Sequence, residues 1–437
     1  MPTGYKWPSS NIGFDDSLRL WSMPLTDISI DSVYDVKVNP LATPDNVNPI
    51  HFNLLPQQLG ALSDVEIHCT FRVLHHDNAA TAVQDDVSII NNIAGGLWNY
   101  VEVYVGDSGN IMQSMNLSYA FQTYFEKIFN HSSNRVDHLQ TSEKFIMDVG
   151  TNKANAEVIH VHHGANDLTT NTGNIARHNE IIQSRVVTTV SKLACPLFTH
   201  HKVLPTKCHI RIVLNRNRNA FVLTCVENGN YKLQIQDVFL KCRYVKPSND
   251  ALDALEVGIS RNPAIYEVEY PEVIFRSVNT GTRYITLTNI FTQKLPKIAF
   301  FALQKTSCLA GEYQSNPFVF GAFEKFQIYI NNEQYFTDPL TNANQRGMLM
   351  QLYKAIGYEY QGECLLNSKN FDINQVVAIP LGANKEFKSS LTLNRHADIR
   401  VEMDLGYLAE HPHNVIIYSL YDKVFEIDVA RNLVLKS

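Results

Sequence analysis

The 437-residue sequence is poor in charge and has no excess of positive charge. Only 18% of its residues are charged, and 37 Lys and Arg against 43 Asp and Glu give a formal net charge of −6. No long-range positive field is available to hold a phosphate backbone, so we expect no nucleic-acid coating and no direct sequence-specific nucleic acid partner. Apolar residues make up 45% of the chain, and its length predicts two or three domains, with two hydrophobic cores as the simplest arrangement.

The sequence also lacks paired cysteines, a secretory signal and a membrane-length apolar run. Its seven cysteines are scattered singly, and their odd number argues against a disulfide framework or a zinc site. We predict buried thiols in a protein that folds in a reducing compartment. The first residues have no apolar core of a signal peptide, and no run of about 18 apolar residues occurs. We therefore expect a protein made inside the cell, not secreted, with no membrane span.

Motifs of catalysis are missing or out of context. Neither G-x-x-x-x-G-K-[ST] nor G-x-G-x-x-G occurs, which disfavours ATP hydrolysis and dinucleotide chemistry. Gly106-Asp107-Ser108-Gly109 resembles the surroundings of a nucleophilic serine, but no histidine stands in a recognisable partner context. Asp-Ser-Gly is ordinary turn chemistry, and we expect a hairpin turn there. The sequence predicts no catalytic residue, no cofactor and no enzymatic activity.

The histidine-rich segment 160–163 is the sharpest candidate for a metal site. On a strand, His160 and His162 would face the same way and could hold a metal as in cupins. The further histidine and carboxylate that a cupin needs are absent at the required offsets, and a turn sequence follows. We expect exposed loop histidines and no metal. The pairs at 75–76 and 200–201 would point to opposite faces of a strand and form no chelate.

Alternation of apolar and polar residues with period two dominates the chain and predicts a mainly β protein. The pattern is clearest in residues 65–73, 99–105, 208–214, 231–245, 265–275, 283–290, 326–330, 399–405 and 414–427. The two halves also repeat a pattern, because similar strand-like segments follow in the same order. Segments 98–105, 209–214 and 231–245 of the first half correspond to segments 323–330, 398–403 and 414–427 of the second.

This repeat divides the chain into four parts. We predict an N-terminal arm at 1–25, a first sandwich at 26–246, a linker at 247–262 and a second sandwich at 263–437. The linker begins Pro-Ser-Asn before spaced leucines, which favours a capped short helix. A polar stretch around 130–180 is expected to be an inserted loop in the first sandwich.

Several segments resemble the double jelly-roll (hexon-like) major capsid proteins of the polinton or Maverick and adintovirus group. The similar segments are 27–34, 48–54, 204–216, 219–223, 231–238, 244–246, 295–297, 316–320 and 414–428. The resemblance implies two tandem jelly-roll β-sandwiches with short helices in loops. It also implies pseudo-hexameric homotrimers that tile an icosahedral viral shell, a location in the virion capsid, and a minor penton-forming capsid protein as partner.

Two other functions remain open from the sequence. A glycan- or receptor-binding β-sandwich protein would share the strand pattern, although the tandem repeat and the missing signal favour the capsid subunit. A cupin-like metalloenzyme using His160 and His162 is the third hypothesis, and bound metal that disappears on His160→Ala would support it.

Overall fold

The computed structural model describes residues 28–44, 48–54, 59–106, 109–113, 118–130, 135–148, 159, 161, 171–200, 202–225, 230–291, 294–357, 364–368, 370–371, 374–382, 391–392 and 395–436. The predicted N-terminal arm at 1–25 lies outside these residues, as do His160, His162, His163 and His201.

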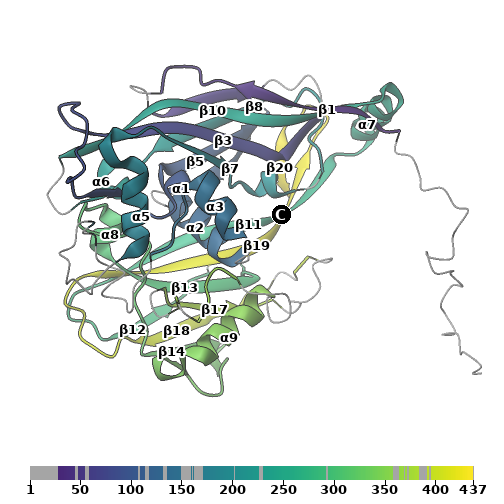
Figure 1. Cartoon of the computed structure of the whole chain (residues 1–437). Helices are drawn as coiled ribbons and strands as arrows, with labels where there is room; N and C mark the ends of the chain where they lie inside the picture. Colours follow the sequence, from purple (N-terminus) through teal and green to yellow (C-terminus); the bar gives the residue numbers. More distant parts are fainter. Residues whose placement is uncertain are drawn as a thin grey trace, which may run out of the picture.

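Strands from the first part of the chain form two four-stranded antiparallel sheets (Figure 1). One sheet has the order β1 (Ile30–Val38), β10 (Tyr231–Pro247), β3 (Leu59–His75), β7 (Val187–Lys192). The other has the order β2 (Ile50–Leu54), β8 (Ile210–Arg216), β5 (Trp98–Val105), β6 (Gly109–Gln113). Buried and less buried residues alternate along β3 between positions 64 and 73, so the period-two pattern places one face of the sheet in the core.

Strands from the last part of the chain repeat this arrangement. One sheet has the order β11 (Ala264–Val278), β19 (His413–Ile427), β13 (Ile298–Lys305), β17 (Val376–Pro380), and β20 (Leu433–Lys436) pairs with β19. The other has the order β12 (Tyr284–Thr288), β18 (Ile399–Asp404), β14 (Lys325–Ile330), β15 (Glu333–Gln334), and β16 (Leu340–Thr341) pairs with β14. Each strand position of the first two sheets has its counterpart here, so the repeat read from the sequence is a repeat of strand order.

A small sheet of β4 (Val87–Ile89) and β9 (Leu223–Cys225) also belongs to the first part of the chain. Among the described residues, no strand before residue 248 pairs with a strand after it in these five sheets. The buried apolar side chains of both parts nevertheless form one contiguous cluster. Separate hydrogen-bonded frameworks therefore share a continuous apolar interior.

Short helices connect the strands. They are α1 (Ile93–Gly96), α2 (Ser118–Asn130), α3 (Val136–Glu143), α5 (Thr172–Ile181), α6 (Asn219–Val222), α7 (Asn249–Arg261), α8 (Thr306–Ala310) and α9 (Gln345–Ile356). At α7 the Ser248 side chain accepts a hydrogen bond from the Ala251 N–H at 3.4 Å, as expected for the predicted cap. No helix within the described part of the chain is long and apolar enough to cross a membrane.

The stretch around 130–180 differs from the predicted loop. It contains α3 and most of α5, and both helices lie against strands of the first part of the chain. Asn171 caps α5, because its side chain accepts a hydrogen bond from the Asn174 N–H. Polar composition obscured the helices, since several of their buried residues, among them Asn174, Arg177 and His178 of α5, are polar.

Candidate functional site

The Gly-Asp-Ser-Gly sequence lies at a hairpin. Strands β5 and β6 pair on either side of it, with Val105 opposite Gly109, and Gly106 has a φ of 69°. Asp107 and Ser108 lie outside the described residues. The prediction of a hairpin connection between two strands is confirmed.

One histidine of each of the two predicted pairs has a structural partner. His75 Nε2 lies 2.8 Å from Asp85 Oδ2, and its ring packs on Tyr231 with a centroid distance of 4.8 Å. The ring of His200 meets the edge of Tyr266 at 5.5 Å. Among the residues described, no group of three or more His, Cys, Asp or Glu side chains could hold a metal ion.

All seven cysteines are buried and none forms a disulfide, as predicted. Burial raises the pKa of the thiols of Cys69, Cys195 and Cys242 to about 12. Because the thiolate is the reactive form, these side chains are inert toward electrophiles at neutral pH. They act as small apolar residues of the core.

A cavity of about 410 Å³ lies between the α3–α5 region and a segment of the second part of the chain. Its described walls carry no carboxyl, amine, imidazole or thiol group, so they offer no side-chain acid or base that could activate the Thr172 hydroxyl. The Asn370 side-chain amide donates to the Leu365 carbonyl at 2.8 Å. The lining residues are Val136, Leu139, Gln140, Phe145, Ile146, Met147, Thr172, Gly173, Ala176, Leu365, Asn367 and Asn370.

Helix α2 joins the two parts of the molecule through aromatic side chains. Phe125 stacks on Phe320 at 5.5 Å and on Tyr418 at 5.2 Å, and Phe129 stacks on Phe300 at 4.3 Å. Phe125 and Phe300 are at most 1% exposed. Since these rings come from both parts of the chain, burial of their faces holds the two sandwiches together as one block.

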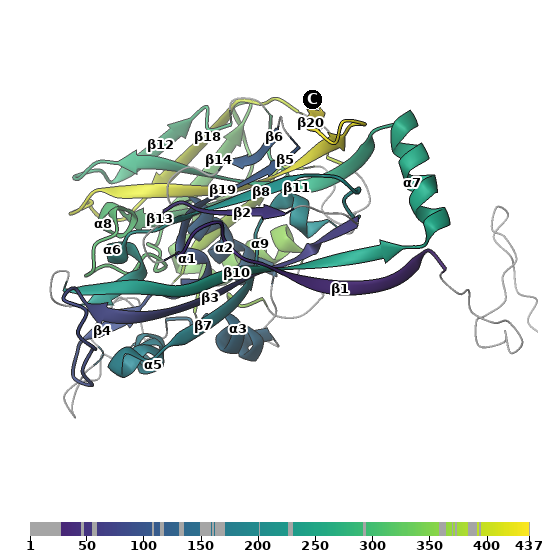
Figure 2. The ribbon, with the colours of Figure 1, turned by 90° about the horizontal axis from the view of Figure 1, so that it is seen from above.

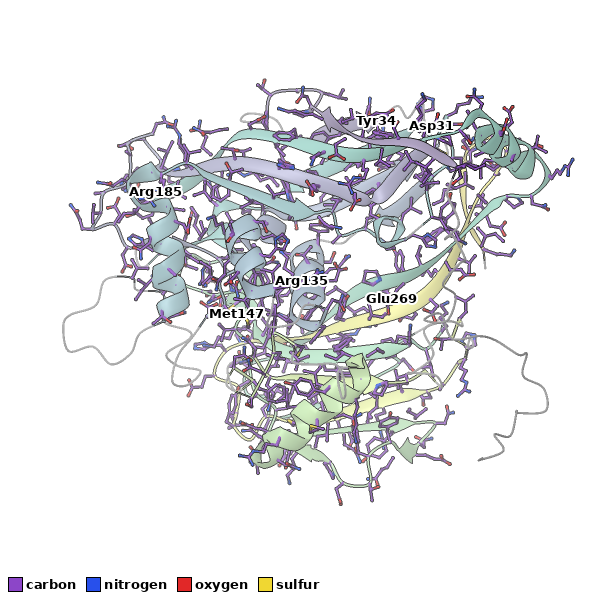
Figure 3. All side chains as sticks on the ribbon, turned by 45° about the vertical axis from the view of Figure 1, so that its right-hand side comes forward. Asp31, Tyr34, Arg135, Met147, Arg185 and Glu269 are labelled. Atoms are coloured by element: carbon purple, nitrogen blue, oxygen red, sulfur yellow. The ribbon has the colours of Figure 1, made fainter. Side chains whose placement is uncertain are left out.

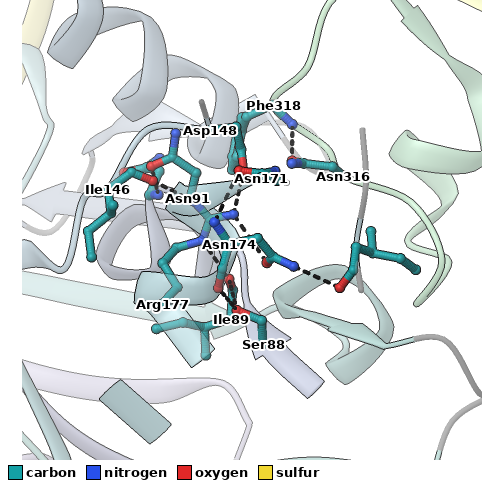
Figure 4. A network of polar contacts seen from close by, with 12 residues as sticks. Ser88, Ile89, Asn91, Ile146, Asp148, Asn171, Asn174, Arg177, Asn316 and Phe318 are labelled. Carbon is teal, nitrogen blue, oxygen red and sulfur yellow. Dashed lines mark hydrogen bonds and ion pairs between the residues drawn. The ribbon is translucent and has the colours of Figure 1, made fainter. Parts of the chain in front are cut away.

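A buried polar network fixes helix α5 (Figure 4). Arg177, which is 1% exposed, donates to the carbonyls of Ile89 and Ile146 and to Asp148 Oδ1 at 2.6 Å. The Asn171 amide donates to the same carboxylate oxygen at 2.8 Å. These hydrogen bonds and the ion pair offset much of the free-energy cost of removing the two charges from water. The network fastens α5 to β4 and to the segment before residue 149.

Helix α7 is fastened to both parts of the chain. Arg431, which follows β19, donates to the Thr206 carbonyl at 2.9 Å and pairs with Glu256 of α7 at 2.7 Å. The hydrogen bond from the Thr206 hydroxyl and the nearby Arg431 guanidinium lower the pKa of Glu256. A Cβ at Gly106 would lie 2.6 Å from the Arg431 carbonyl, so this corner is also closely packed.

Glu126 lies on α2, the helix that joins the two parts of the molecule, and it makes the stability of the folded chain depend on pH. Burial, together with the charge of Glu269, raises the pKa of its carboxyl to about 7, against opposing contributions from Gln122 and Lys127. The folded chain therefore holds this proton more tightly than the unfolded chain. The resulting stabilisation is full below pH 4.5, the ordinary value, and is lost as pH rises to 7.

Glu126→Gln should remove that dependence, because the amide stays neutral and still accepts from Gln122. We expect the variant to be more stable than the wild type at pH 8, by on the order of 2 kcal/mol, with little difference near pH 4.5. Urea unfolding across this pH range measures it. Glu333→Gln, which changes an exposed carboxyl, is the control and should leave the pH profile unaltered. Parallel profiles for wild type and Glu126→Gln would contradict the assignment.

Comparison with known proteins gives the fold. No family model matches the chain. An uncharacterized protein of Caenorhabditis elegans is 19% identical over 374 residues, covering 80% of this chain and 81% of its own. A chain in the cryo-EM structure of the Sputnik virophage superposes with a TM-score of 0.63 at 11% identity, covering 100% of this chain and 94% of its own.

Two further structures agree. The mavirus major capsid protein has a TM-score of 0.58 at 9% identity, with 99% of this chain and 96% of its own covered. A chain in the quasi-atomic model of the PBCV-1 virus capsid has a TM-score of 0.57 at 9% identity, covering 95% and 99%. These neighbours are viral double jelly-roll proteins, and the predicted fold of two tandem jelly rolls with short helices in loops is confirmed.

Proposed function

We propose that this chain is a structural capsid subunit without catalytic activity. The observation that carries the proposal is the double jelly-roll fold. It matches a virophage chain and the mavirus chain over nearly the full length of both chains in each comparison. The described side chains support it, because the buried polar groups fasten helices and strands to one another. The described cavity walls, in addition, provide no carboxyl, amine, imidazole or thiol group.

Two equivalent sandwiches in each chain favour a particular assembly. Three chains would supply six similar sandwiches, so a homotrimer would have a pseudo-hexameric outline and could tile an icosahedral shell. We assign the sandwiches to residues 26–246 and 263–437, with the linker at 247–262 and a terminal arm at 1–25 that reaches neighbouring capsomers. By its resemblance, the protein would belong to the polinton and adintovirus group, reside in the virion capsid after synthesis inside the host cell, and meet a minor penton-forming protein.

Negative-stain imaging of the purified chain tests this proposal. We expect hexagonal outlines of single capsomers, and closed shells at high protein concentration. As a control for the cupin-like alternative, metal content should be the same in wild type and His160→Ala. Compact monomers with no hexagonal particles, or stoichiometric metal that His160→Ala removes, would contradict the capsid role.

A further inference from the structure

Three short helices bring an amine, a carboxamide and a carboxylate into contact. Lys127 lies in the last turn of α2, Asn92 immediately precedes α1, and Glu143 is the last residue of α3. Figure 2 shows α1 and α2 side by side among the strands, and in Figure 3 the labelled Arg135 and Met147 mark the two ends of the segment that carries α3. Lys127 Nζ donates a hydrogen bond to Asn92 Oδ1 and forms an ion pair with Glu143 Oε2.

This cluster is shielded from water. Asn92, Lys127 and Glu143 are 0%, 7% and 8% exposed. The buried ring of Phe145 lies 5.5 Å from Lys127 Nζ, measured to the ring centroid. Removing an ammonium and a carboxylate from water costs free energy that their mutual attraction only partly returns. A reaction that turned both groups into neutral ones would therefore be favoured at this place.

The side chain of Asn92 is held with its carbonyl toward the amine. The backbone of Asn92 is left-handed, with φ of 52°, a conformation that asparagine adopts more readily than most residues. Its Nδ2 donates to the Ala120 carbonyl at 3.1 Å and to the Thr123 hydroxyl at 3.0 Å. A Cβ at Gly95 would overlap that hydroxyl, so glycine lets α1 approach α2 this closely. Because the amide nitrogen is bound to α2, the carbonyl end is the one that meets Lys127.

We propose that Lys127 and Asn92 join in an isopeptide bond, an amide between two side chains, with release of ammonia. A bond forms between Lys127 Nζ and Asn92 Cγ, and the Cγ–Nδ2 bond of Asn92 breaks. Of the three protons on Nζ, one stays on the new amide, one leaves with Nδ2 as ammonia, and one remains on Glu143. Glu143 thus carries protons away from the attacking nitrogen. The step consumes no other reactant, and both buried charges disappear.

Positioning and burial explain why an ordinarily unreactive carboxamide would react here. Groups held in contact within one molecule react as if at effective concentrations of up to about 10⁵–10⁸ M. Exclusion of water strengthens the electrostatic interactions of Glu143 and protects the product from hydrolysis. The buried pair of Arg177 and Asp148 lacks this chemistry, because a guanidinium keeps its proton and is no nucleophile. The reaction occurs once in each chain, and it goes beyond the proposed capsid function without depending on it.

Peptide mapping of the purified wild-type chain by mass spectrometry tests the bond. An endoprotease that cleaves after glutamate places Asn92 in peptide 67–102 and Lys127 in peptide 127–143. We expect one linked species, lighter than the sum of the two peptides by one ammonia, about 17 Da. Two separate peptides, each with its full mass, would overturn the proposal. The map is more specific than the mass of the intact chain, because the Asn228-Gly229 sequence can also lose ammonia by cyclising to a succinimide.

Conservative variants separate bond formation from the buried contacts. Lys127→Arg keeps a positive charge beside Glu143 but provides no amine, and it should give separate peptides. Glu143→Gln removes the proton carrier, so linking should slow by about a hundredfold or more, with the second peptide extending to residue 157. Lys144→Arg makes the same change at the neighbouring lysine, which pairs with Glu180, and should remain linked as in the wild type.

The variants have contradicting outcomes of their own. Linked peptides in Lys127→Arg would show that another amine forms the bond. Undiminished linking in Glu143→Gln would show that Glu143 does not carry the protons. Either result overturns the assignment of the three residues, and the wild-type map remains decisive even for a variant that fails to fold.

Discussion

Arg177→Met should lower the free energy of unfolding by about 3–5 kcal/mol, because it leaves a buried carboxylate without its cation. Asp148 is 1% exposed. Of the contacts described above, only the hydrogen bond from Asn171 would remain to stabilise the Asp148 carboxylate once Arg177 is removed. The carbonyls of Ile89 and Ile146 would also lose their donor. Urea unfolding monitored by circular dichroism measures the loss.

Two variants make this measurement specific. Arg185→Met removes an exposed arginine that follows α5 and donates to the Asn179 carbonyl at 3.3 Å, so it should change stability by no more than about 0.5 kcal/mol. Adding Asp148→Asn to Arg177→Met removes the stranded charge and should recover part of the loss. A comparable cost for Arg177→Met and Arg185→Met would show that the buried pair does not hold α5.

Phe125→Ala should cost about 3–5 kcal/mol, because it opens a cavity in the seam between the two sandwiches. The ring is fully buried and stacks on Phe129 as well as on Phe320 and Tyr418 of the second part of the chain. Loss of these contacts should weaken the coupling of the two sandwiches along with the overall stability. Denaturant unfolding followed by intrinsic fluorescence and by circular dichroism measures both.

A conservative change at the same position provides the control. Phe125→Leu keeps much of the buried apolar volume, and its cost should be less than half that of Phe125→Ala. We also expect the two optical probes to give different midpoints in Phe125→Ala and coincident midpoints in Phe125→Leu. A cost below about 1 kcal/mol for Phe125→Ala would show that α2 is not the element that joins the sandwiches.

Strand periodicity and the repeated order of segments were sufficient to predict the double sandwich. Both signals are local, since residues that alternate along a strand report which face is buried whatever that strand pairs with. The cap at Ser248 likewise depends only on nearby residues, and it predicted the start of α7 correctly. The end of α7 at Arg261 lies beyond the spaced leucines that suggested the helix.

The buried polar contacts that hold helices α5 and α7 in place could not be predicted from local sequence patterns. Arg177 and Asp148 are 29 residues apart and form a buried pair only because α5 packs beside the preceding segment. Thr206, Glu256 and Arg431 come from three distant parts of the chain. The exposure of β1 was also invisible, because an edge strand and a central strand can show the same alternation.

The mass of the purified chain in solution tests the central claim most directly. Light scattering behind a sizing column should give about three times 49.6 kDa for the smallest stable species, with larger assemblies at higher concentration. A mass of 49.6 kDa at every concentration would contradict the proposed capsid role.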